Sequence, residues 1–86
     1  MPEIARFAGV VIRMYFDDHP PPHFHATAAA DDLVVSLFPL EVRQGRLPAP
    51  VLRLVLHWAS IHQVELLNNW ARVRAGQPPM PIPPPE

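Results

Sequence analysis

Apolar residues in the first half of the chain fall into short runs separated by turn-forming residues. The runs "VVIRMYF" at 10–16 and "DDLVVSLFP" at 31–39 are rich in β-branched and aromatic residues, which favours strands. The prolines within Asp17–Pro22 force a turn after the first run. The sequence "HFHATAA" from His23 then resumes an extended pattern. These runs predict an antiparallel meander.

The stretch "EVRQGRLPAP" separates these strands from the second half of the chain. It contains Gly45 and Pro48, which predicts a loop with a short fourth strand near Val42. The first half of the chain is therefore expected to form three to four strands.

The apolar spacing changes to steps of three and four from Pro50 to Ala75, which predicts an amphipathic helix. The stripe consists of Val51, Val55, Trp58, Ala59, His62, Leu66, Trp70 and Val73. Pro50 suits a first helical turn, and Gly76 followed by Pro78 ends the pattern. At ~1.5 Å per residue this helix is nearly 40 Å long. The predicted fold class is α+β, a small antiparallel β-meander of three to four strands with one long C-terminal helix packed across it.

With 86 residues, the chain has room for one domain with one modest core. We assign residues 1–76 to a single α+β domain. The proline-dense stretch "QPPMPIPPPE", residues 77–86, is expected to form an extended tail.

Charge and composition narrow the classes of partner. The formal net charge is −1, so electrostatics gives no general reason to expect nucleic acid or an acidic membrane as partner. Neither disulfides nor a thiolate metal site is available, because the chain has no cysteine. The N-terminal residues lack the pattern of a secretory signal, and no apolar run is long enough to span a bilayer. We expect a soluble, cytoplasmic protein with no membrane partner.

Three of the five histidines lie in the proline-rich stretch "DDHPPPHFHA". On a strand, His23 and His25 share one face with Cα atoms ~6.5–7 Å apart, which allows both imidazoles to bind one ion. Asp17, Asp18 and His19 lie across the turn and are candidates for a third ligand. The pattern predicts a site for a divalent transition metal, zinc or nickel. The simpler alternative is a turn in which each imidazole makes ordinary hydrogen bonds.

His62 occupies a position in the helical stripe where Leu or Ile is expected. The simpler interpretation is a buried histidine oriented by Glu65, three residues later. The alternative is that His62 reaches the His23 and His25 pair as a further metal ligand.

Strand alternation tests this alternative. If Ile12, Met14 and Phe16 face the helix, Arg13 and Tyr15 face away from it. The next strand would place Phe24 and Ala26 on the helix side and His23 and His25 beside Arg13 and Tyr15. A slip of one residue would reverse this arrangement, so the position of His62 relative to the pair stays open.

A face that carries Arg13, Tyr15, His23 and His25 also has the groups needed to cleave RNA without a metal. One histidine accepts the 2′-hydroxyl proton, a second group protonates the leaving oxygen, and arginine stabilises the charged phosphorane. The chain has no excess of basic over acidic residues, which argues against an enzyme that binds RNA through its phosphates. Nucleic acid stays open as a partner.

The segments "MPEIARFAGVVIRMYFDDHPPPHFHA" and "LPAPVLRLVLHWASIHQVELLNNWARVRAGQPP" together resemble a family of small bacterial proteins, the domain of unknown function 4160 family. The central stretch "ATAAADDLVVSLFPLEVRQG" is more alanine-rich and apolar than this family pattern, which leaves the register of the third strand open. The family motif falls on Arg13, Tyr15, Asp18, His19, Pro21, Pro22, His23, His25, Trp58, His62, Glu65, Asn69 and Trp70.

The resemblance implies membership of a toxin–antitoxin-like two-gene cassette, and therefore a protein partner encoded nearby. Our first hypothesis is a small cytoplasmic interaction or regulatory protein of such a pair, with the histidine-rich turn as its functional centre and a bound divalent metal as an option. The second is a small metal-independent ribonuclease that uses His23 and His25 as acid and base with Arg13 at the phosphate. The third hypothesis is that the histidines only stabilise the turn and that the function lies on another surface. The edge strand of so small a sheet can pair with a strand of another copy. A homodimer is therefore a further alternative, although no single residue specifies one.

Overall fold

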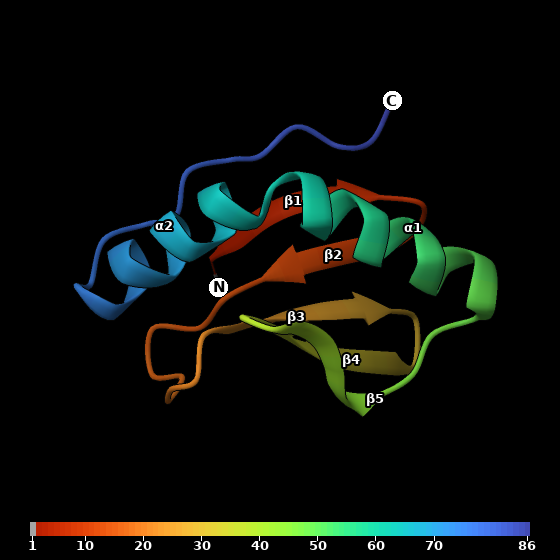
Figure 1. Ribbon diagram of the computed structural model, residues 1–86, viewed down its shortest axis with the longest axis horizontal. Coiled ribbons are helices and arrows are strands. Elements are labelled where there is room, and N and C mark those ends of the chain that lie inside the picture. Colours follow the sequence, from red (N-terminus) through yellow and green to blue (C-terminus); the bar gives the residue numbers. More distant parts are fainter. Residues whose placement is uncertain (1) are drawn as a thin grey trace.

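Five strands and two helices make up residues 2–86, the part of the chain that the computed structural model describes (Figure 1). In chain order they are β1 (Glu3–Phe7), β2 (Val10–Arg13), β3 (His23–Ala28), β4 (Asp31–Leu37), β5 (Leu40–Gly45), α1 (Ala49–Ile61) and α2 (Gln63–Arg74). The α+β class is confirmed. The predictions of three to four strands and of one long helix are wrong.

The strands form one antiparallel sheet in the order β1-β2-β3-β4-β5. The unpredicted strand is β1, which pairs with β2 through a tight turn at Ala8 and Gly9. Both turn residues have positive φ, 52° and 75°, as hairpin turns that match the strand twist require. Asn-Gly or Asp-Gly is the usual sequence signal of such a turn. The chain has Ala-Gly here, so the hairpin was not predicted.

The predicted faces of β2 and β3 are confirmed by the register. Ile12 pairs with Ala26 and Arg13 pairs with His25. Ile12 and Ala26 are fully buried, as are Met14 and Phe24. Arg13 and His25 therefore share the opposite face of the sheet. Phe16 departs from the expectation and is half exposed, because β2 ends at Arg13 and the alternation ends with it.

Both helices pack on one face of the sheet (Figure 1). Six of the eight predicted stripe positions are buried, namely Val55, Trp58, Ala59, Leu66, Trp70 and Val73. Val51 and His62 are partly buried, and Asn69 is a buried position that the stripe did not include. The helix is interrupted at His62, where φ is −106° and ψ is 23°. No proline or glycine lies near the junction, and the first residue of α2 contacts the sheet: the side-chain amide of Gln63 donates to the backbone carbonyl of Leu37 in β4. This contact ties the start of α2 to the sheet, and the bend lets the two helices follow the twisted strands.

The C-terminal segment after α2 contains no helix or strand and returns along α2 towards β1 (Figure 1). Its Ile82 is buried in the core, and the Ile82 N–H donates to the carbonyl of Ile4 at 3.1 Å. The indole Nε1 of Trp58 donates to the carbonyl of Pro83 at 2.8 Å. These contacts hold the proline-rich segment against the domain.

Over residues 2–86, neither helix combines the length and the apolar character that a membrane crossing requires.

Candidate functional site

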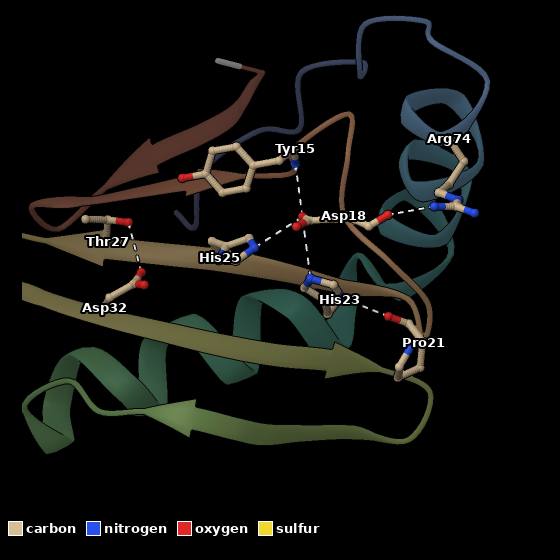
Figure 2. A network of polar contacts seen from close by, with 8 residues as sticks. All are labelled: Tyr15, Asp18, Pro21, His23, His25, Thr27, Asp32 and Arg74. Carbon is tan, nitrogen blue, oxygen red and sulfur yellow. Dashed lines mark hydrogen bonds and ion pairs between the residues drawn. The ribbon is translucent and has the colours of Figure 1, made fainter.

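The proline-rich loop between β2 and β3 folds back over the start of β3. The Tyr15 N–H donates to Asp18 Oδ2 at 3.1 Å, and the Asp18 N–H donates to the carbonyl of Tyr15 at 3.1 Å. These reciprocal hydrogen bonds close a tight turn from Tyr15 to Asp18. They direct the Asp18 carboxylate towards the histidines of β3 (Figure 2).

Asp18, His23 and His25 form the centre of the candidate site (Figure 2). Asp18 Oδ2 lies 3.2 Å from Nε2 of His25 and 3.4 Å from Nε2 of His23. One ligand atom of each residue lies within 4.8 Å of the other two. The side chains are mostly buried, with exposed fractions of 17% for Asp18 and His25 and 14% for His23.

The tautomer of His23 follows from its second contact. Its Nδ1 lies 2.8 Å from the backbone carbonyl of Pro21, and since a carbonyl only accepts, Nδ1 carries the proton of this hydrogen bond. In a neutral ring Nε2 is then unprotonated, and its lone pair faces the Asp18 carboxylate. Two acceptors at this distance repel each other unless a cation lies between them, either a proton on His23 or a metal ion.

Aromatic rings enclose the two histidines. The His25 ring lies 4.6 Å from the Tyr15 ring and 5.2 Å from the His23 ring, measured between centroids. The His23 ring also lies 5.0 Å from the ring of Trp70 in α2. The imidazoles are thus held in position by rings from the loop, the sheet and the helix.

Arg13 lies beside the centre, directly across from His25 in the sheet. Its Nε is buried and has no hydrogen-bond partner among the residues that the structure describes. The predicted grouping of Arg13 and Tyr15 with His23 and His25 on one face agrees with the register and the ring contacts.

Three of the candidate ligands lie outside the group of three. Asp17 and His19 are exposed in the loop. His62 lies at the junction of the helices, where Nδ1 contacts Oε1 of Glu65 and the ring packs 5.6 Å from the ring of Trp58. The predicted orientation of His62 by Glu65 is therefore confirmed.

Sequence reasoning missed three groups that support the centre. Trp70 packs on His23, the Pro21 carbonyl accepts from His23, and Arg74 donates to the carbonyl of Asp18. Because Trp70 lies in the predicted helical stripe, its burial was expected. No local sequence pattern indicated the contact of His23 with the Pro21 carbonyl or of Arg74 with the Asp18 carbonyl.

Two of the three ligand-atom spacings match a tetrahedral zinc site. In a tetrahedral site with bonds of ~2.0–2.1 Å, neighbouring ligand atoms lie about 3.3 Å apart. The two distances from Asp18 Oδ2 are close to this value. A carboxylate oxygen and two imidazole nitrogens are ligands that zinc and nickel accept.

Comparison with curated proteins and with solved structures finds no match for the chain. The family model described as domain of unknown function (DUF4160) matches residues 9–71. The matched region contains the proline-rich loop, the sheet from β2 onward and most of both helices. On the strength of this match, the chain belongs to the DUF4160 family.

Proposed function

We propose that this chain is a small metal-binding interaction domain in which Asp18, His23 and His25 bind one divalent transition-metal ion, zinc or nickel. The observation that carries the proposal is that Asp18 Oδ2 lies 3.4 Å from Nε2 of His23 and 3.2 Å from Nε2 of His25, while Nδ1 of His23 is engaged by the Pro21 carbonyl. A metal ion at this point would be bound by all three groups.

The surroundings of the three ligands support the proposal. Metal-binding histidines usually donate their second ring N–H to a carbonyl or carboxylate, as Nδ1 of His23 does to Pro21. The Tyr15 N–H orients the Asp18 carboxylate in the same way. Both contacts reduce the conformational entropy that metal binding would otherwise cost.

Three protein ligands leave one position of a tetrahedral ion open. A bound metal there acts as a Lewis acid and accepts one further donor, from water or from another molecule. In the proposed role this donor comes from a partner protein, which the family resemblance suggests is encoded beside this chain. Copurification with that neighbour tests the partner, and loss of the complex in His23→Ala/His25→Ala would make the metal part of the contact.

The first experiment is the elemental metal content of untagged protein purified without chelator. We expect near-stoichiometric zinc or nickel in the wild type and its loss in His23→Ala/His25→Ala. His57→Ala is the matched control, because His57 is exposed on α1 and lies outside the candidate site. His19→Ala and His62→Ala should also retain the metal. Equal metal content in the wild type and the double variant contradicts the proposal.

A metal-independent ribonuclease is the second candidate. The observation that favours it is Arg13 across from His25, with a buried Nε that has no partner among residues 2–86. The competing observation is that both Nε2 atoms converge on Asp18, where they are less available to act as acid and base on a substrate. RNA cleavage that persists in EDTA and is lost in His25→Ala would favour the ribonuclease.

A further inference from the structure

The two edges of the sheet differ in how they are covered. At the β1 edge, the C-terminal segment lies alongside and the Ile82 N–H donates to the carbonyl of Ile4. At the other edge, β5 pairs with β4, and among residues 2–86 no further strand follows it. Five of the six residues of β5 are exposed. A bare edge presents unpaired backbone N–H and C=O groups, which can pair with another strand.

Charged residues on an edge strand usually oppose pairing with other strands. On β5 the charges are Glu41 and Arg43, one on each side of Val42. The two side chains contact each other, with Arg43 Nη1 3.2 Å from Glu41 Oε1, so they point to the same face of the sheet. Val42 itself is 39% exposed.

The order Glu41-Val42-Arg43 is complementary to itself under two-fold symmetry. If two β5 strands pair antiparallel about Val42, each Glu41 lies opposite Arg43 of the other copy. Opposite charges at directly opposed positions stabilise a strand pair, whereas like charges destabilise it. The two Val42 side chains meet at the centre of the same contact.

Phe38, in the turn before β5, is 77% exposed and lies outside the strand that would pair. A shift in register between Val34 and Val35 marks a bulge near Arg43, so we expect a short contact centred on Val42.

We propose that the β5 edge is a homodimer interface, in which two copies of this chain pair antiparallel about Val42 and join their sheets. We identify the partner as a second copy of this chain because Glu41 and Arg43 of one copy face Arg43 and Glu41 of the other under two-fold symmetry. The proposal is independent of metal binding, since β3 and the proline-rich loop carry the candidate metal site.

The mass of the protein in solution is the first test. Sedimentation velocity over a wide range of concentrations should show a species of twice the 9.7 kDa chain mass that becomes more abundant as concentration rises. A purely monomeric protein at every concentration overturns the proposal and leaves the edge to a different partner.

Charge reversal tests the register. Glu41→Arg and Arg43→Glu should each weaken the dimer, because each places like charges opposite one another. The double variant Glu41→Arg/Arg43→Glu restores the complementarity and should recover the dimer. Circular dichroism establishes that each variant is folded. A dimer that is unaffected by the single changes, or that the double change does not restore, overturns the proposal.

Cysteine crosslinking tests the symmetry axis directly, because the chain has no native cysteine. Directly opposed residues on antiparallel strands have Cβ atoms ~4.5–5.5 Å apart, so a small movement of the strands brings them to the ~3.5–4.5 Å of a disulfide. Val42→Cys should therefore oxidise to a covalent dimer in high yield. Met80→Cys is the control, because Met80 is 57% exposed on the C-terminal segment, away from β5. Equal yields for the two variants overturn the proposal.

Discussion

Arg74 in the last turn of α2 donates from Nη1 to the backbone carbonyl of Asp18, 2.7 Å away and 56 residues earlier in the chain (Figure 2). Its guanidinium carbon also lies 6.0 Å from the ring centre of Trp70, the residue that packs against His23. The C-terminal end of the helical layer therefore holds both the loop that carries Asp18 and one of the two histidines.

Arg74→Ala should loosen the loop while leaving the fold intact. The hydrogen bond is charge-assisted but exposed, so we expect a loss of about 1 kcal/mol in the free energy of unfolding. Hydrogen exchange at the Asp18 and His19 amides should become faster. Arg53→Ala on the exposed side of α1 is the control, and equal exchange in the two variants contradicts the role of Arg74.

Asn69→Ala should release the C-terminal segment. Asn69 is buried; its Nδ2 donates to the carbonyl of Met80 at 2.9 Å, and its Oδ1 accepts from the Met80 N–H at 2.7 Å. Losing both hydrogen bonds should cost about 1–3 kcal/mol. Chemical denaturation and limited proteolysis of the segment measure the effect. Asn68→Ala, an exposed neighbour, should leave both unchanged.

Gly45→Ala should destabilise the sheet strongly. Gly45 has φ of +82°, and a Cβ there would collide with the backbone carbonyl of Asp32. The sum of backbone strain and collision is about 3 kcal/mol. Gly9→Ala is the matched control, because Gly9 has a similar φ of +75° with nothing within 4 Å, so only the strain of about 1 kcal/mol applies. Similar losses in thermal denaturation would mean that the Asp32 contact is unimportant.

The Glu3–Arg6 pair predicts a small dependence of stability on pH. The hydrogen bond from Arg6 lowers the pKa of Glu3 below its ordinary value of 4.5. A lowered pKa stabilises the folded state above the unfolded pKa, and this contribution disappears as pH falls through the folded pKa. Both groups are exposed, so salt should weaken the effect. The difference in melting temperature between the wild type and Glu3→Gln should therefore shrink as pH is lowered below 4.5.

Metal addition should stabilise the protein if the proposed site is correct. A ligand that binds only the folded state at 100 times its dissociation constant adds about 2.7 kcal/mol to the free energy of unfolding. Zinc should raise the melting temperature of the wild type, EDTA should reverse the rise, and His23→Ala/His25→Ala should show neither change. A rise of the same size in the double variant would place the zinc elsewhere on the protein.

The amino-acid pattern predicts the α+β class, the helical stripe and the two faces of β2 and β3. These features depend on local periodicity, because a strand alternates its side chains and a helix repeats every 3.6 residues. Burial of Ile12 and Phe24 on one face therefore leaves Arg13 and His25 on the other. The same alternation predicted that His23 and His25 lie together.

The remaining features depend on contacts between distant parts of the chain. The Ala8–Gly9 turn that creates β1 lacks the usual residues, and the helix is interrupted at His62 without a proline or glycine. The approach of Asp18 to the histidines depends on the path of a proline-rich loop held by Arg74. Contacts between residues so far apart in the chain leave no periodic signal in the sequence, because packing of the whole domain brings them together.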